Sequence, residues 1–127
     1  MKNQYDFQAL GQRTDGPSRN LETFPAPSGV TSITFTTDEF TSHCPVTRQP
    51  DFSEVTIEYV PEQKCIESKS LKLYLWSFRE ETAFCEALAA KIAGDIMAAC
   101  EPKYCKVTVA QKARGGIALT AVAEERK

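Results

Sequence analysis

The chain has 127 residues with a formal net charge of -2, and 42% of the residues are hydrophobic and 25% charged. This length and composition suit one globular domain and give no sign of a nucleic-acid-binding or disordered tail. No apolar run reaches the roughly 20 residues that cross a bilayer, and the first residues lack the apolar stretch of a secretory signal. We therefore expect a cytoplasmic protein with a single hydrophobic core.

The N-terminal residues 1–28 are polar and are interrupted repeatedly by glycine and proline. This composition predicts an N-terminal arm, which Leu21 and Phe24 could anchor against the domain or against a neighbouring subunit. The single domain is expected over residues 29–127.

Two strands separated by a loop are expected next. Residues 30–40 alternate and are rich in β-branched side chains, which favours a strand. Residues 53–60 also alternate, as in a half-buried antiparallel strand. The intervening residues 40–52 contain Pro45 and Pro50 without helical spacing, so they are predicted to form a loop.

Helical patterns follow a turn at residues 61–64. Ser68 is a suitable N-cap for a helix through residues 71–78. Thr82 can cap a second helix over residues 83–100, whose apolar stripe and high alanine content favour a helix.

The C-terminal part contains two more expected strands, over residues 104–110 and 117–123, joined by a tight turn around Arg114-Gly115-Gly116. The order strand, strand, helix, helix, strand, strand predicts an α+β domain: a four-stranded antiparallel sheet with both helices on one face. Its unprotected edge strands would be covered by oligomerisation.

Cysteines are numerous but irregularly spaced, and the only histidine is His43. A structural zinc site needs paired ligands a few residues apart, so no metal site is predicted. Without a secretory signal, disulfides are not expected either. The commonest role for an isolated cysteine is that of a small buried hydrophobe, and this alternative applies to all five: Cys44, Cys65, Cys85, Cys100 and Cys105.

Cys44 nevertheless stands out, because Pro45 follows it and Asp51 returns on the same loop. Proline biases the residue before it toward an extended conformation, which would hold the sulfur in one place. A thiolate is a strong nucleophile, and Asp51 could exchange a proton with whatever the sulfur attacks. The spacing alone is equally compatible with an ordinary loop.

Three further groups could bind ligands. The lysines and serines of residues 67–74 begin a predicted helix and suit an anionic group such as a phosphate, although a solvated first turn would look the same. Glu86 could accept two N–H donors from a guanine-like edge, or it could be an exposed surface residue. Arg114-Gly115-Gly116 could simply be a hairpin turn.

Together these groups form a specific pattern: CPxTxQPDF at residues 44–52, ESKSLKLYLxSFR at 67–79, a Phe-x-Glu helix start at 84–86, and RGGI at 114–117. Over residues 21–119 the chain resembles the 7-cyano-7-deazaguanine reductases, the NADPH-dependent nitrile reductases of queuosine biosynthesis in tRNA modification. The resemblance implies the tunnelling fold (T-fold), in which such domains form a pentameric barrel. These barrels usually pair as a decamer with active sites between subunits.

The resemblance also implies roles for individual residues. Cys44 would add to the nitrile carbon to give a covalent thioimide, and Asp51 would donate the proton. NADPH would then deliver two hydrides in succession. The substrate-binding set would be Glu67, Ser68, Cys85 and Glu86, and the cofactor-binding set would be Ser68, Lys69, Ser70, Lys72, Arg114 and Gly115.

Three positions depart from the family pattern. Cys85 stands where the family usually has histidine, His43 stands where it more often has an apolar residue, and Arg48 replaces a common glycine. Two alternative functions therefore remain: a relative that passes the thioimide to an amine to form an amidine, and a non-catalytic protein that binds a deazapurine or a pterin.

Overall fold

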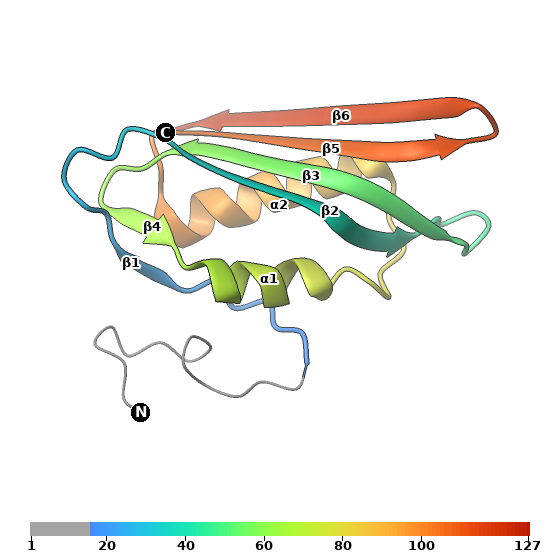
Figure 1. The fold of residues 1–127 in the computed structure, drawn as a ribbon, viewed down its shortest axis with the longest axis horizontal. Helices are drawn as coiled ribbons and strands as arrows, with labels where there is room; N and C mark the ends of the chain where they lie inside the picture. The colour runs from blue at the N-terminus through green and yellow to red at the C-terminus, as the bar shows by residue number, and fades with distance from the viewer. Residues whose placement is uncertain (1–15) are drawn as a thin grey trace.

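The computed structural model describes residues 16–127, so the first part of the predicted N-terminal arm lies outside the described residues. Its centre is a four-stranded antiparallel sheet in the order β2-β3-β5-β6, with both helices on one side of it (Figure 1). The elements are β1 (Thr23–Pro25), β2 (Ile33–His43), β3 (Pro50–Val60), β4 (Lys64–Ile66), α1 (Ser68–Trp76), α2 (Cys85–Cys100), β5 (Tyr104–Arg114) and β6 (Ile117–Arg126). The predicted α+β architecture is confirmed.

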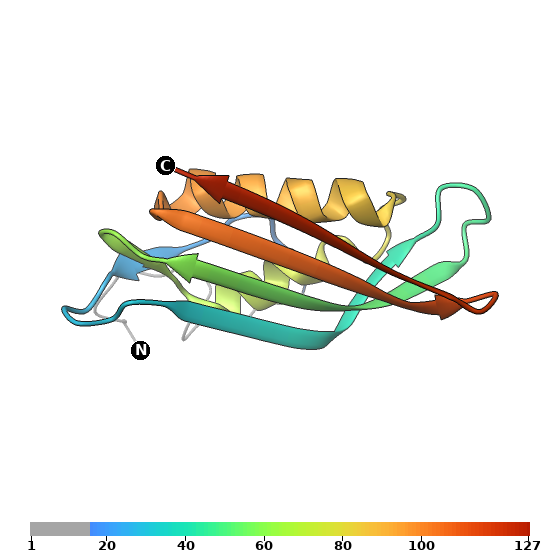
Figure 2. The same cartoon turned by 90° about the horizontal axis from the view of Figure 1, so that it is seen from above.

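The core lies between the sheet and the helices, as the alternation of the strands requires. In β3, Val55, Ile57 and Tyr59 are buried, and they pair with Val109, Val107 and Cys105 of β5. The intervening side chains of both strands lie on the other face of the sheet. Figure 2 looks down on that open face, which no helix of the described chain covers.

A bulge in β2 decides which side chains face the helices near the end of the strand. The pairing with β3 shifts register between Thr37 and Phe40. One extra residue in β2 changes the face of everything after it. As a result Phe40 and Ser42 are buried, and they pair with the buried Ser53 and Asp51 of β3.

The strands are longer than predicted, so the loop before β3 is shorter. β2 continues to His43 and β3 begins at Pro50, which leaves residues 44–49 as the loop instead of 40–52. Pro50 is tolerated because it is the first residue of its strand, where a missing N–H does least harm. The last hairpin also extends further in both strands, to Arg114 in β5 and to Arg126 in β6.

Both predicted helix caps were wrong. The N-cap of α1 is Glu67, whose two carboxylate oxygens accept from the backbone N–H groups of Ser70 and Lys69 at 2.8 and 2.7 Å. The N-cap of α2 is Phe84, without a side-chain bond. Thr82 instead forms an isolated parallel bridge with His43 at the end of β2.

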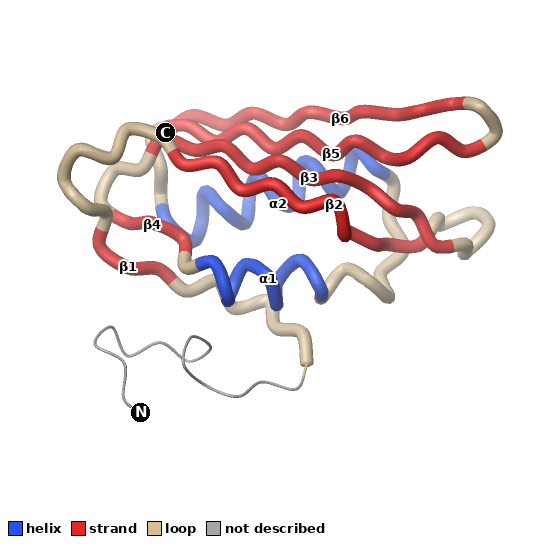
Figure 3. The backbone as a smooth tube through the Cα atoms, viewed as in Figure 1, coloured by secondary structure: helices blue, strands red, loops and turns tan. Residues whose placement is uncertain are grey.

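A second, two-stranded sheet was not predicted. β1 pairs with β4, with Phe24 opposite Cys65, and both strands were too short to show an alternating pattern (Figure 3). Leu21 packs against the core, as expected for an anchor of the arm. Among residues 16–127, neither helix is long and apolar enough to span a membrane.

Candidate active site

The loop after β2 closes tightly around Cys44. The Cys44 N–H donates to the carbonyl of Gln49 at 2.9 Å, and the Arg48 N–H donates back to the carbonyl of Cys44 at 2.8 Å. To close this turn, Arg48 adopts a φ of 63°, in the left-handed region that favours glycine. The loop therefore holds the Cys44 sulfur in one place, and the sulfur is almost buried.

The environment of Cys44 favours the thiolate. The backbone N–H and hydroxyl of Thr47 and the backbone N–H of Val46 donate hydrogen bonds to the sulfur, and Arg114 adds another. Because donors stabilise the anion, they lower the pKa of Cys44 from 9.0 to about 7, although burial opposes this shift. About half of the thiol is therefore ionised at neutral pH.

Asp51 lies on the helix-facing side of β3 because it alternates in phase with Val55 and Ile57 along the strand. It is 5% exposed, and a guanidinium nitrogen of Arg114 lies 2.7 Å from its Oδ1. The contact is an ion pair without well-directed hydrogen-bond geometry, and among the described residues Oδ1 accepts no hydrogen bond. Asp51 thus keeps acceptor capacity for a proton or a ligand.

The segment before α2 ties this helix to the end of β2. The His43 N–H donates to the carbonyl of Glu81 at 2.9 Å, and the Ala83 N–H donates to the carbonyl of His43 at 3.2 Å. These bonds fix the first turn of α2, with Cys85 and Glu86, relative to the Cys44 loop. His43 serves here through its backbone.

Cys85 is buried on the first turn of α2, and its thiol donates to the carbonyl of Val109 at 3.4 Å. Burial raises the pKa of Cys85, and the carboxylates of Glu86 and Asp51 add to this effect. Cys85 is therefore a neutral thiol beside Asp51. Glu86 is exposed on the same turn and can reach a ligand.

The predicted site residues thus form two groups. Cys44, Asp51, Cys85, Glu86 and Arg114 gather at one end of the sheet. Sequence reasoning placed Arg114 with the cofactor and did not select Thr47, although Thr47 belongs to the CPxTxQPDF pattern that could have pointed to it.

The second group begins α1 and divides into buried and accessible residues. Ser70 is 1% exposed, and its hydroxyl accepts from the Glu22 N–H and donates to the Glu67 carbonyl. Glu67 is also buried and caps the helix. Ser68 and Lys72 are exposed and can meet a ligand.

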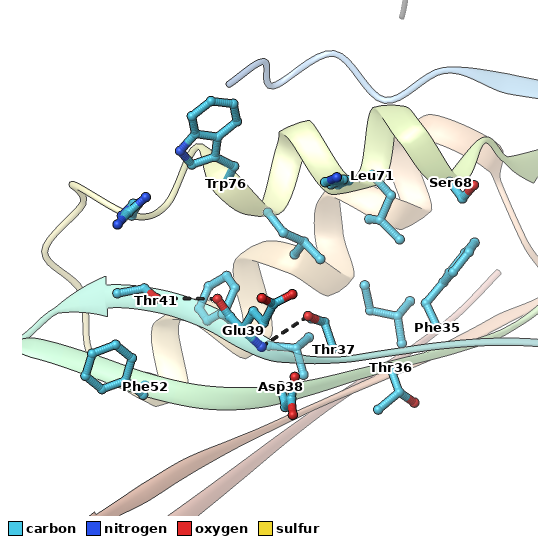
Figure 4. A pocket seen from close by; sticks show the side chains of 16 residues that line it. Phe35, Thr36, Thr37, Asp38, Glu39, Thr41, Phe52, Ser68, Leu71 and Trp76 are labelled. Carbon is cyan, nitrogen blue, oxygen red and sulfur yellow. Dashed lines mark hydrogen bonds between the residues drawn. The ribbon is translucent and has the colours of Figure 1, made fainter. Parts of the chain in front are cut away.

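A groove runs between α1 and β2 and has a volume of about 770 Å³. In Figure 4, Ser68 and Leu71 on α1 lie across from Phe35 and Thr37 on β2. Besides these, the groove is lined by Thr36, Asp38, Glu39, Phe40, Thr41, Phe52, Val55, Ile57, Lys72, Leu75, Trp76 and Arg79. Hydroxyl and cationic groups at the start of α1 are the chemistry that an anionic cofactor requires, so the exposed residues present here fit NADPH.

The two groups lie at opposite ends of α1 within one chain. Ser68 begins this nine-residue helix beside β4, whereas the Cys44 loop lies beyond its other end (Figure 1). Nine helical residues span roughly 13 Å. Within one chain, the start of α1 therefore lies away from the Cys44 nucleophile.

Comparisons with known proteins give a consistent picture. A family model described as "QueF-like protein" matches residues 50–127. The chain is 50% identical over 113 residues to the NADPH-dependent 7-cyano-7-deazaguanine reductase of Alkalilimnicola ehrlichii, covering 87% of this chain and 88% of that protein. Proteins of the same name from Nitrosospira multiformis and Halorhodospira halophila are 48% and 49% identical, covering 87% and 85% of this chain and 81% and 93% of their own lengths.

A solved structure is also similar, the archaeosine synthase QueF-Like in its apo form. It superposes with a TM-score of 0.72 at 29% sequence identity, covering 76% of this chain and 95% of that chain.

Proposed function

The chain belongs to the family of QueF-like proteins, and from this membership we propose that it reduces the nitrile of 7-cyano-7-deazaguanine to an aminomethyl group with NADPH. The product, 7-aminomethyl-7-deazaguanine, serves queuosine biosynthesis in tRNA. The observation that carries the chemistry is the Cys44 sulfur, which is held by the donors of Thr47 and lies in one cluster with Asp51. An activated thiol near a carboxyl group is what addition to a nitrile requires.

The first step is addition of the Cys44 thiolate to the nitrile carbon. A carbon–sulfur bond forms, one carbon–nitrogen π bond breaks, and the nitrogen takes a proton that we assign to Asp51. The substrate is then bound covalently as a thioimide. The lowered pKa of Cys44 supports this step, and it also makes the sulfur a good leaving group when the covalent bond later breaks.

The cofactor NADPH supplies two hydrides in succession when bound. Ser68, Lys69 and Lys72 at the start of α1 would hold its anionic groups, with Ser70 supporting that turn from inside and with Arg114 and Gly115 approaching from the β5–β6 hairpin. Glu86, Cys85 and Ser68 would bind the guanine-like edge of the substrate, and Glu67, whose two carboxylate oxygens cap α1, would support the turn that carries Ser68. The exposed carboxylate of Glu86 can accept two parallel N–H donors.

We place the complete active site between two chains. This placement is supported by the distance between the start of α1 and Cys44 within one chain. A neighbouring chain can place the start of its own α1 close to Cys44. The edge strands β2 and β6 are 11 and 10 residues long, and within residues 16–127 no strand pairs with their outer sides. The proposed assembly is the T-fold barrel, a pentamer paired as a decamer.

Exposed apolar side chains around the Cys44 end support such an interface. Val46 is 77% exposed and Ile117 73%, and Phe52 and Phe84 are also more than half exposed. Large exposed apolar groups at one end of a molecule mark a contact surface. A cytoplasmic location is proposed because the low-pKa thiol of Cys44 requires a reducing compartment to stay free.

The test is the stoichiometry of the reaction. With limiting 7-cyano-7-deazaguanine, two equivalents of NADPH should be oxidised per aminomethyl product, and Cys44→Ala should abolish the oxidation. In a second experiment, ammonia replaces NADPH. It tests amidine formation, the rival activity suggested by the similarity to an archaeosine synthase. Formation of an amidine without NADPH oxidation would replace reduction by that activity.

A further inference from the structure

Arg114 is held at the end of the β5–β6 hairpin by its turn. Gly115 and Gly116 have φ values of 59° and 78°, which glycine adopts without strain, so β6 follows after two residues. The pairing of β5 with β6 shifts register between Gln111 and Arg114. Because Gln111 pairs with Ser53 of β3, the residues that follow it lie beside Asp51.

One guanidinium contacts both reactive groups of the site. It lies 2.7 Å from Asp51 Oδ1, and it is the weakest of the donors that lower the pKa of Cys44. The Asp51 side chain is only 6% exposed, whereas that of Arg114 is 43% exposed. The Arg114 side chain therefore extends from the surface into the site, where its guanidinium lies near both the Asp51 carboxylate and the Cys44 sulfur.

The geometry suits arginine in particular. The guanidinium carries five donors in a rigid planar fork, so one side chain can serve two acceptors at fixed positions. A lysine ammonium carries the same charge but does not impose that fork. Contact with both acceptors orients the Cys44 loop and the start of β3 relative to each other.

We infer that Arg114 orients Asp51 and stabilises the Cys44 thiolate for the addition step, before NADPH takes part. The family resemblance assigns Arg114 to the cofactor, whereas its contacts within this chain are with the nucleophile and the proposed proton donor. Arg114 is thus a positioning residue for the chemistry of a step that needs no cofactor. This inference rests on the proposed function for its role in addition, but not for its effect on Cys44.

The experiment separates the two roles by leaving NADPH out. The variants are Arg114→Gln and Arg114→Lys, with Lys112→Gln as a matched control that removes one positive charge from the same hairpin. The pH dependence of Cys44 alkylation by iodoacetamide is followed by peptide mass spectrometry, without substrate. Adduct formation with 7-cyano-7-deazaguanine, also without NADPH, is followed by intact-protein mass.

Arg114→Gln should shift the alkylation midpoint of Cys44 upward from about 7. At pH 7 it should slow both alkylation and adduct formation by about twofold, because a rise of half a pKa unit from 7 lowers the thiolate fraction from about one half to about one quarter. Arg114→Lys should recover part of the loss, and Lys112→Gln should match the wild type. If Arg114→Gln does not fold, a smaller but measurable slowing in Arg114→Lys carries the same test.

The inference is overturned if the Arg114 variants match the wild type in both assays and only the KM for NADPH rises. A wild-type protein that forms no adduct would instead refute the proposed function. In that case the alkylation profiles still decide whether Arg114 acts on Cys44.

Discussion

Cys44 and Cys85 are both buried, yet their surroundings shift the two thiol pKa values in opposite directions. Cys44 receives hydrogen bonds from a turn of backbone N–H groups and from Thr47, which stabilise its anion. Cys85 donates its own proton to a carbonyl and lies among carboxylates, which disfavour its anion. One residue is therefore fitted to be a nucleophile, and the other remains a neutral side chain.

Thr47 should control the reactivity of Cys44, because its donors have the largest effect on the pKa of that thiol. Thr47→Val removes the hydroxyl donor and should raise the midpoint of the pH–alkylation profile of Cys44. The alkylation rate at pH 7 should fall by about threefold or more. Thr47→Ser keeps the hydroxyl and serves as the control. Equal profiles for the valine and serine variants would contradict the assignment.

At position 48, a glycine variant should be more stable than an alanine variant, which is the reverse of the usual order. At most positions alanine is more stabilising than glycine, but the φ of 63° at Arg48 strains any residue with a Cβ atom. Arg48→Gly should therefore unfold with a free energy about 1 kcal/mol higher than Arg48→Ala. Urea denaturation of the two variants measures this difference, and a more stable alanine variant would count against the loop geometry.

At the scale of elements, the first turn of α1 combines buried structural residues with exposed residues that we assign to the cofactor, all within four positions. Glu67 caps the helix, and Ser70 connects that cap to Glu22 of the N-terminal segment. Ser68 lies on the exposed side of the same turn. Within the ESKS sequence, the buried residues therefore build the turn, and the exposed residues are accessible to the cofactor.

This division predicts different effects for two serines. Ser70→Ala removes the buried hydroxyl that accepts from the Glu22 N–H and donates to the Glu67 carbonyl, and it should cost about 1–3 kcal/mol of unfolding free energy. Ser68→Ala should leave stability within about 0.5 kcal/mol of the wild type, while the KM for NADPH rises. Thermal denaturation together with steady-state kinetics separates them. A stable Ser70→Ala variant with a raised KM would instead make Ser70 a direct ligand.

The sequence predicted the long elements well and the connections between them poorly. The strands around Val55 and Val107 and the helix through Leu88 were identified from their alternating or helical patterns. β1 and β4 have three residues each, too few for a pattern. The caps failed because a glutamate side chain replaced the expected serine, and because Thr82 was engaged with β2.

The sequence pointed to candidate site residues, but it did not show how these residues lie relative to one another. The motif around Cys44 and Asp51 pointed to both residues. The burial of Asp51 follows from the alternation of β3, but the predicted strand began only at residue 53 and left Asp51 in the loop. The one-residue bulge in β2, which the sequence does not signal, turns Phe40 and Ser42 to the same face. The approach of Arg114 to Asp51 depends on the register between β3 and β5 and on the hairpin turn, which are long-range properties of the sheet.

At the scale of the whole molecule, the proposed assembly builds each active site from two chains. The nucleophile lies at one end of the sheet and the start of α1 at the other end of the helix, while no strand of the described residues pairs with the outer sides of β2 and β6. A ring of chains related by rotation would bring the start of one α1 to the Cys44 end of its neighbour.

Complementation tests this arrangement. Cys44→Ala and Lys72→Glu should each be nearly inactive alone. Co-expressed as mixed oligomers, they should recover about a quarter of the wild-type activity, because random assembly places an intact Cys44 opposite an intact Lys72 at one interface in four. Oligomers of each variant mixed without exchange of chains are the control. No recovery in mixed oligomers would place both residues in one chain's site.

In the proposed mechanism Cys44 binds the nitrile substrate covalently before reduction, and intact-protein mass spectrometry can detect this adduct. After exposure to 7-cyano-7-deazaguanine without NADPH, the wild-type mass should rise by one substrate molecule, and the added mass should disappear once NADPH is supplied. Cys44→Ala should gain no mass. An unmodified wild-type protein, or an adduct that persists in Cys44→Ala, would contradict the account.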